Sequence, residues 1–220
     1  MAKNEFIDKL QIHGNVFVDK DGCLNIIGLK GIMFPMVNYV LLYELLKENT
    51  DRKKVRDIFY YTGFMETFIA VKIIGDKYGF KDKRKILSLV LNQAQMIGIG
   101  KLELIKYEPQ NSHFVLGNSQ SPPGRETLKL LGKRKEAVDE ICRGGIAGIF
   151  SSLFEKDMVA IETSCVVQGK SQCVHVVRER KVWAKTRLNA ESKEQIPLSP
   201  RKYPLLNKFL EKENLLSRIF

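Results

Sequence analysis

Three of the four cysteines of the 220-residue chain lie in one stretch, Cys142–Cys173, with the sequence CRGGIAGIFSSLFEKDMVAIETSCVVQGKSQC. Its first part is predicted to be helical. Met158 to Val167 and Gln172 to Val177 are rich in β-branched residues and flank Gly169. Because glycine supplies the positive φ that a tight turn needs, the stretch predicts a helix that faces a β-hairpin, with thiols on both elements.

The cysteine usage and the lack of an apolar leader after the N-terminus predict a cytoplasmic protein. Its thiols are then expected to stay reduced or to bind metal rather than to form disulfides. The longest apolar run, Ile32 to Leu46, has about 15 residues, whereas about 20 are needed to cross a bilayer. We therefore expect no membrane span, and a helix here that is buried or lies in a subunit interface.

The net charge of +11 favours contact with polyanions such as nucleic acid. Many of the basic residues alternate with acids, as in 51–57 (DRKKVRD), which is typical of a solvated face. The segment 178–220 is more strongly basic, with 11 Lys and Arg and 5 Asp and Glu. Its three prolines predict a linker before a short amphipathic helix, Leu205 to Ile219.

Hydrophobic periodicity and turn residues predict the other elements. Asp21-Gly22 predicts the turn of a hairpin over Val16 to Ile27, and Cys23 beside this turn is given no role. The expected helices are Met33 to Asn49, Arg52 to Tyr78 with an N-cap at Thr50 or Asp51, Lys83 to Ile97, and a long helix that follows 118–124 and ends near Phe154; the expected strands are Lys101 to Tyr107 and Ser112 to Leu116.

The thiols of the central stretch have the chemistry of a zinc site. Thiolate, carboxylate and imidazole groups bind zinc in proteins, and a structural zinc takes four of them. Cys165 and Cys173 would lie on opposite strands of the hairpin, within about 5 Å, and could share one ion. Gly145 and Gly148 follow Cys142 at steps of three, which lets another element approach that helix closely. The helix would then supply Cys142 as a third ligand; a core of reduced thiols is the alternative.

Two residues compete for the fourth position. Glu162 precedes Cys165 by three residues, and such a step along a regular strand puts the two side chains on opposite faces. A bulge or bend between them is therefore required. His175 lies two residues after Cys173 and on its face, so simple alternation favours it. Spacing alone leaves this choice open.

These residues resemble a known family, the 4-vinyl-reductase-type domain, a small-molecule-binding module also found in aromatic-responsive transcription activators. The resemblance covers about Ile97 to Val177. It is carried by Gly98-Ile-Gly100 and the following KLELIKY, by Asn118-Ser119, by Cys142, Gly145 and Gly148, and by Glu162, Cys165, Gly169 and Cys173.

The resemblance implies a structural zinc bound by Cys142, Glu162, Cys165 and Cys173. It also implies an α/β (α+β) fold similar to that of TRAPP transport-complex subunits, in which an antiparallel sheet of hairpins packs against long helices. A homodimer with an apolar cavity near the metal is expected. The chain has no tryptophan between Asn118 and Cys142, where phenol sensors of the family have an aromatic residue, which argues against phenol as the ligand.

We therefore predict a zinc-stabilised, dimeric binding or sensor module for a hydrophobic small molecule, with residues 1–180 as the ligand-binding domain and 181–220 as a basic linker and helix. Four protein ligands leave no open position on the metal, and the sequence has no dinucleotide fingerprint, so enzymatic activity is not favoured. The alternatives are a scaffold or regulator that contacts protein or nucleic acid through the basic tail, and a tetrapyrrole vinyl reductase or its accessory factor. The residues expected to line the ligand pocket are Phe64, Phe68, Met96 and Phe150.

Overall fold

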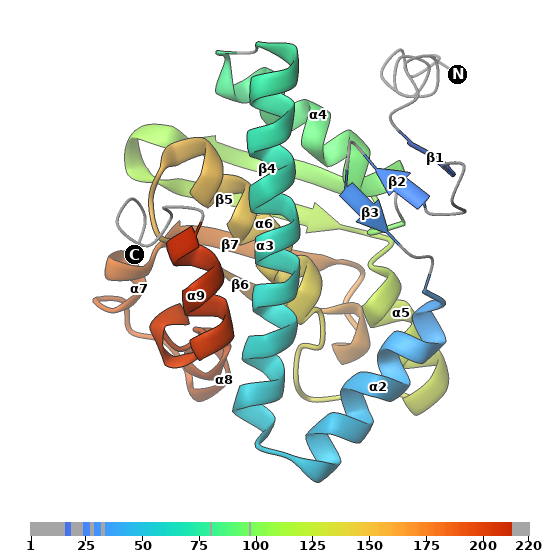
Figure 1. Ribbon diagram of the computed structural model, residues 1–220. Coiled ribbons are helices and arrows are strands. Elements are labelled where there is room, and N and C mark those ends of the chain that lie inside the picture. The colour runs from blue at the N-terminus through green and yellow to red at the C-terminus, as the bar shows by residue number, and fades with distance from the viewer. Residues whose placement is uncertain are drawn as a thin grey trace.

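The protein has three layers, in which helix α6 lies between helix α3 and a four-stranded antiparallel sheet (Figure 1). Helix α3 spans Arg52–Tyr78 and α6 spans Glu140–Phe154. The largest apolar core lies between these helices and the sheet. The predicted α+β class is confirmed. The computed structural model describes residues 16–18, 24–26, 29–31, 34–79, 81–96 and 98–212.

The sheet has the strand order β4-β5-β7-β6, and every neighbouring pair is antiparallel. Both of its predicted strand pairs form, each around a single 3-10 turn, η1 or η2. The bounds are Leu102–Glu108 for β4, Pro109–Asn111 for η1, His113–Asn118 for β5, Met158–Ser164 for β6, Val166–Gln168 for η2 and Cys173–Glu179 for β7.

Strand β6 contains the irregularity that the spacing of Glu162 and Cys165 requires. Its register against β7 shifts between Glu162 and Ser164, and the chain then enters η2. Gly169 ends that turn with φ of 83°, a conformation that favours glycine. The shift allows Glu162 and Cys165 to point to the same side of the hairpin.

The predicted helices before the sheet are confirmed. They are α2 (Met36–Asn49), α3 and α4 (Lys83–Met96). Asp51 caps α3, because its side chain accepts a hydrogen bond from the Lys54 amide at 2.8 Å.

The N-terminal hairpin also forms. Its strands β1 (Val16–Val18) and β2 (Leu24–Ile26) pair antiparallel, and a third strand, β3 (Leu29–Gly31), adds to β2. The Asp21-Gly22 turn and Cys23 lie outside the described residues.

Glycines bring α3 and α6 into direct backbone contact. A Cβ at Gly144 would overlap the carbonyl oxygen of Tyr60, and a Cβ at Gly148 would overlap that of Phe64. Gly63 on α3 is equally close to the carbonyl of Ile141. At Gly145, which was predicted to lie in the contact strip, a Cβ would meet the Thr67 side chain at 3.2 Å and the Gly63 carbonyl oxygen at 3.7 Å. Gly148 thus lies in the strip of close approach as predicted, and Gly144 and Gly63 add to that strip.

The long helix expected to end near Phe154 is wrong, because two helices occupy this region. Helix α5 spans Pro122–Leu131 and stops at Gly132, whose φ of 74° is incompatible with a continuing helix. The connection to α6 then bonds to distant parts of the chain. Arg134 donates its amide to Val167, and Ala137 donates its amide to Glu191. These long-range contacts override the local helical pattern.

The chain after β7 packs on the core. It forms α7 (Arg180–Trp183), α8 (Ala190–Gln195), η3 (Pro200–Lys202) and α9 (Pro204–Lys212). Buried Asp57 of α3 accepts hydrogen bonds from the Leu198 amide and the Tyr203 hydroxyl, which fixes this segment to α3. The predicted helix to Ile219 thus has a described part, α9, and the rest lies outside the described residues. The division at residue 180 stays a prediction.

Helix α3 is apolar along most of its length. By length and composition alone, Arg52–Asp76 would suffice to cross a membrane. Half of its apolar window is buried inside the protein, as it would be in the core helix of a folded domain. The large apolar side chains that α2 exposes are Leu41, Leu42 and Leu45, and Phe34, two residues before the helix, is exposed as well.

Candidate functional site

A first group of side chains that could hold a metal ion lies at the turn end of the β6–β7 hairpin. One ligand atom from each of Glu162, Cys165 and Cys173 lies within 4.8 Å of the other two. All three residues are at most 3 % exposed. The register shift in β6 brings Glu162 to this group, while the turn η2 brings Cys165 back toward β7.

The two sulfur atoms of this group have the spacing of zinc ligands. The Sγ atoms of Cys165 and Cys173 are 3.7 Å apart, far beyond the bond length of about 2.05 Å in a disulfide. Two thiolates bound tetrahedrally to one zinc at about 2.3 Å lie about 3.8 Å apart. The reduced pair therefore fits a shared ion without rearrangement.

Hydrogen bonding and burial divide the protons unequally within this group. A hydrogen bond from Cys173 lowers the pKa of Cys165 to about 6, and the backbone amides of Val167 and Val138 add to this effect. The pKa of Cys173 is raised, because its proton is retained in that bond. This hydrogen bond thus favours the thiolate form of Cys165, and thiolate is the form that binds metal.

Glu162 is buried and forms no ion pair or hydrogen bond through its carboxylate with the described residues. Burial raises the pKa of Glu162 well above its usual range, and the nearby Cys165 and Asp139 raise it further. Its backbone is fixed, because the Gln195 side chain accepts from the Glu162 amide at 2.7 Å and donates to the Glu162 carbonyl at 2.9 Å. A buried carboxylate with two unpaired oxygens is costly unless a cation or a proton neutralises it, so the donor set fits a metal.

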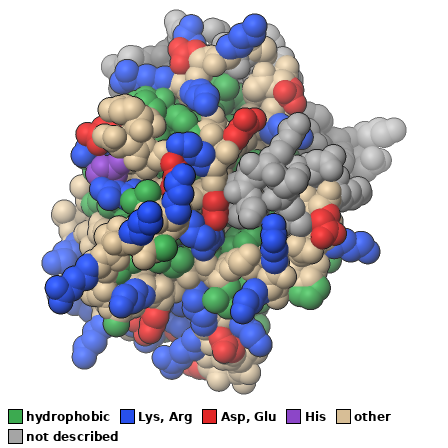
Figure 2. Space-filling model, turned by 90° about the vertical axis from the view of Figure 1, so that its left-hand side faces the viewer, with side chains coloured by type: hydrophobic (Ala, Val, Ile, Leu, Met, Phe, Trp, Pro, Cys, Tyr) green, Lys and Arg blue, Asp and Glu red, His purple; other side chains and the backbone are tan. Residues whose placement is uncertain are grey.

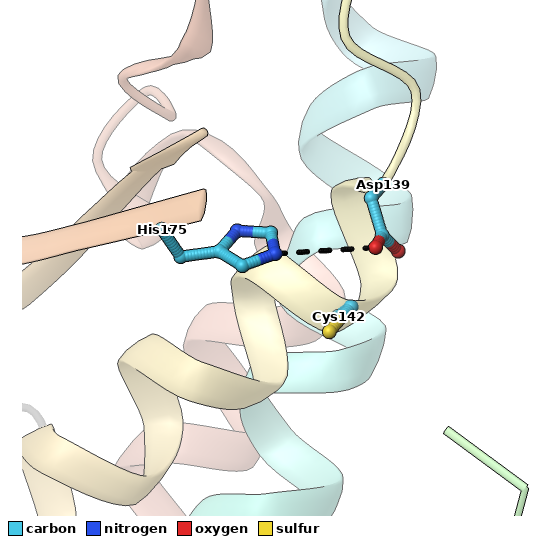
Figure 3. Close-up of side chains that lie close together, drawn as sticks. All are labelled: Asp139, Cys142 and His175. Carbon is cyan, nitrogen blue, oxygen red and sulfur yellow. Dashed lines mark ion pairs between the residues drawn. The ribbon is translucent and has the colours of Figure 1, made fainter. Parts of the chain in front are cut away.

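A second group lies next to the first, where α6 meets β7. It consists of Asp139, Cys142 and His175, whose ligand atoms are also within 4.8 Å of one another. In Figure 3 the imidazole of His175 points from β7 toward the Asp139 carboxylate, and the Cys142 sulfur lies beside them. Asn118 contacts this sulfur, with 3.9 Å between Nδ2 and Sγ. All three members are at most 2 % exposed.

Burial suppresses charge in the second group. It raises the pKa of Asp139 to about 7, against the hydrogen bond that the Ser121 hydroxyl donates to this carboxylate at 2.6 Å. Burial, with a contribution from nearby Arg143, lowers the pKa of His175 to about 3. The imidazole is therefore neutral at physiological pH. Burial also raises the pKa of the Cys142 thiol.

An apolar groove of about 730 Å³ separates α3 from α9. Three hydroxyl groups lie in it, and each is bonded within the protein: Tyr61 to the Leu198 carbonyl, Thr62 to the Ile58 carbonyl, and Tyr203 to Asp57. The groove therefore offers apolar surface and no free hydrogen-bonding side chain among its hydroxyls. Its lining residues are Ile58, Tyr61, Thr62, Met65, Tyr203, Pro204, Leu205, Leu206 and Phe209.

Part of the chain matches a known family. Residues 125–179 match the 4-vinyl-reductase domain. The resemblance inferred from the sequence is thus confirmed, and the matched segment contains both candidate metal-ligand groups. No curated protein matches the chain.

The chain is also similar to three solved structures. The phenol-responsive sensory domain of the transcription activator PoxR, solved with phenol, is 16 % identical with a TM-score of 0.72, over 82 % of this chain and 93 % of that chain. A trafficking protein particle complex subunit 3 from Naegleria fowleri, covalently bound to palmitic acid, is 12 % identical with a TM-score of 0.46, over 66 % of this chain and 95 % of that chain. A vinyl-4-reductase family protein from Methanocaldococcus jannaschii is 19 % identical with a TM-score of 0.45, over 81 % of this chain and 97 % of that chain. The first of these shows that the shared fold extends beyond residues 125–179.

The structure places the four predicted metal ligands in two adjoining groups. Glu162, Cys165 and Cys173 lie together, and Cys142 lies in the neighbouring group with His175 and Asp139. Glu162 and His175 are paired residues of β6 and β7, so both of the rival fourth ligands face the same compartment. Asp139 was not anticipated. The one signal that could have found it is its position just before the first turn of α6, where helices favour aspartate.

The residues predicted to line a ligand pocket are mostly core residues. Phe64, Phe68 and Phe150 are at most 4 % exposed, and the Phe64 and Phe68 rings stack at 5.8 Å. Phe68 also lines a polar-rimmed pocket of about 350 Å³ between α3, α4 and α6. Met96 ends α4, and its side chain lies outside the described residues. Their role as ligand contacts stays a prediction.

The basic residues form no single patch on the face of the protein shown in Figure 2. On the face seen in Figure 2, Lys and Arg side chains are scattered between apolar and acidic ones instead of forming one continuous patch. Some basic side chains of the C-terminal segment act within the fold. Arg180, for example, bonds to Asp157 at 2.6 Å and to the Pro197 carbonyl at 2.7 Å. Binding of nucleic acid or of a protein through this segment stays a prediction.

Proposed function

We propose that the protein is a zinc-stabilised, dimeric sensor module that binds a hydrophobic small molecule in the cytoplasm. The observation that supports this most directly is the buried group Glu162, Cys165 and Cys173, in which the sulfur spacing and an unpaired carboxylate suit a zinc ion. The 4-vinyl-reductase domain match over the same residues, and the shared fold with a phenol-responsive sensory domain, support a sensing role.

In this proposal Cys142 completes the zinc site and joins α6 to the β6–β7 hairpin. Cysteine thiolates and a carboxylate would bind the ion directly, and their four positions leave no place for a reacting water. The ion would supply structural cross-linking and charge neutralisation. Gln195 fixes the backbone of Glu162, so the carboxylate is held in place before the ion binds.

The groove between α3 and α9 is the proposed ligand site. Its volume lies in the range of about 300–1,000 Å³ that is usual for small-molecule sites. Because its hydroxyls are already bonded, it would select a ligand by shape and apolar surface. The wall formed by α3 contacts α6 through Gly63, and α6 supplies Cys142. A ligand that moves α3 would thus act on the element that the metal holds.

Replacing Ile58 with glutamate is expected to weaken binding of an apolar probe. Ile58 lines the groove and is 52 % exposed, so the change places a charge in the site with little loss of packing. We expect at least about a tenfold rise in the Kd of anilinonaphthalene sulfonate, measured by its fluorescence, which corresponds to about 1.4 kcal/mol.

The matched control is Ile105→Glu, which makes the same change at an exposed isoleucine of β4 outside the groove. It should leave the Kd of the probe within about twofold of the wild-type value. Equal weakening by Ile58→Glu and Ile105→Glu would show that the probe responds to net charge and would exclude the groove as its site.

The exposed leucines of α2 support the proposed dimer. One face of this helix packs on the protein through Tyr39 and Tyr43, and the opposite face exposes Leu42 and Leu45. The double change Leu42→Glu, Leu45→Glu is expected to convert a dimer to a monomer in sedimentation velocity, because like charges would face each other across a symmetric contact. Ile105→Glu should leave the dimer intact. A wild-type monomer would contradict the proposed assembly.

A further inference from the structure

We propose that the buried compartment binds a second divalent cation of the zinc type, held by Asp139, His175 and the thiolate of Cys142. Cys142 would bridge this ion and the zinc ion of the proposed function, on which the inference rests. The first ion would then have Glu162 and three cysteines, and the second would have three protein ligands.

The geometry of Asp139 and His175 leaves room for an ion. Their nearest atoms, Oδ2 and Nε2, are 4.0 Å apart, which is too long for a hydrogen bond. Zinc bonds to oxygen and nitrogen measure about 2.0–2.2 Å, so an ion fits between two atoms at this separation. Tetrahedral geometry would bring the two atoms to about 3.4 Å, a closure of about 0.6 Å.

Asp139 and His175 both have polar atoms without hydrogen-bond partners. Neither ring nitrogen of His175 has a partner among the described residues, and Asp139 Oδ1 lacks one as well. Ser121 bonds to the other oxygen, Oδ2, at 2.6 Å, which orients the carboxylate. Such an outer hydrogen bond to a ligating carboxylate is a regular feature of metal sites. Buried polar groups without partners are rare, and a cation between Oδ2 and Nε2 would give one ring nitrogen of His175 a partner and neutralise the Asp139 carboxylate.

The charges of the compartment balance with two ions. Its five acidic donors, two carboxylates and three thiols, carry five negative charges when all are deprotonated. Arg143, fully buried beside them, contributes one positive charge, and the neighbouring Arg56 is already paired with Glu140 at 2.7 Å. Two divalent cations then make the compartment neutral, whereas one leaves two uncompensated negative charges, which is costly in a buried site.

The two ions would differ in chemistry. The first has four protein ligands and is closed. The second has three, and zinc with three protein ligands normally keeps a fourth position for water or for another donor atom. The second ion would therefore accept an exchangeable oxygen, nitrogen or sulfur ligand inside the protein.

Metal stoichiometry of the full chain tests this inference. Wild-type protein saturated with zinc and dialysed should contain about two zinc ions per chain by atomic emission. His175→Leu and Asp139→Asn should each contain about one, because they remove a ligand of the second ion only. Ile105→Glu is the control and should keep two. Loading with cobalt(II) should give a wild-type spectrum of two spin-coupled ions, and in His175→Leu that of one isolated ion.

The outcomes separate the second site from the proposed zinc site. One zinc per chain in wild type, unchanged by His175→Leu and lost in Cys165→Ser, would overturn the second site and keep the first. No zinc in wild type would overturn both. If His175→Leu fails to fold by circular dichroism, the wild-type stoichiometry and the Asp139→Asn variant still decide between one ion and two.

Discussion

Cys165→Ser is expected to remove the zinc ion and to destabilise the protein by about 4 kcal/mol or more. Structural zinc contributes about 10–16 kcal/mol of apparent binding free energy in small domains, and whole domains are stable by only about 5–15 kcal/mol. Part of this contribution should survive in the remaining ligands. For a chain of this size, where each kcal/mol shifts Tm by about 2–4 °C, we expect Tm to fall by at least about 10 °C.

The measurement is thermal unfolding followed by circular dichroism, with zinc content determined on the same samples. Cys173→Ser should behave like Cys165→Ser, since the two sulfurs would share the proposed ion. Cys23→Ser is the matched control for loss of a thiol, because the sequence gives Cys23 no part in the cluster, and its Tm should be unchanged. A metal-free wild type that melts at the same temperature as Cys165→Ser would contradict the structural role of zinc.

Gly144→Ala is expected to destabilise the protein by about 3 kcal/mol or more. The new Cβ would overlap the Tyr60 carbonyl oxygen, and main-chain atoms in two packed helices cannot move aside as a flexible side chain can. Overpacking in a core typically costs about 1–3 kcal/mol and sometimes more, and this site lies at the central contact of the fold. Gly63→Ala, on the facing helix, should have a similar effect.

Gly75→Ala is the matched control on α3. Its Cβ would have one neighbour, the Cδ1 atom of Ile86, at the comfortable distance of 4.0 Å. Alanine is favoured over glycine within a helix by about 1 kcal/mol, so this variant should be as stable as wild type or more so. Urea unfolding of the three variants measures the differences. An unchanged midpoint for Gly144→Ala would show that α3 and α6 are farther apart in solution.

Much of the site could be predicted because its determinants are local. The Glu162 to Cys165 spacing conflicts with simple strand alternation, and that conflict correctly indicated the register shift in β6. The same alternation put His175 on the face of Cys173, where the structure also has it. Local patterns of this kind suffice when a hairpin supplies the geometry.

The rest depended on contacts between distant segments. The break between α5 and α6 is held by hydrogen bonds to η2 and to Glu191, which the local sequence does not predict. Gly132, with its positive φ, is the one local signal that α5 ends there. Asp139 approaches His175 only because this connection and α6 pack against β7. The groove likewise exists because Asp57 anchors the returning chain at Leu198 and Tyr203. Composition and periodicity carry no information on such pairings.

The paired hydrogen bonds between Gln195 and Glu162 also cover part of an edge of the sheet. Strand β6 is an edge strand of the four-stranded sheet, and an edge strand with free backbone groups can pair with a strand from another molecule. The side-chain amide of Gln195 forms hydrogen bonds with the backbone N–H and C=O of Glu162, and the buried Arg143 side chain donates a hydrogen bond to the carbonyl of Ala160. Gln195 of the C-terminal segment and Arg143 of α6 thus bond to backbone groups of β6 with which a strand from another molecule would otherwise pair.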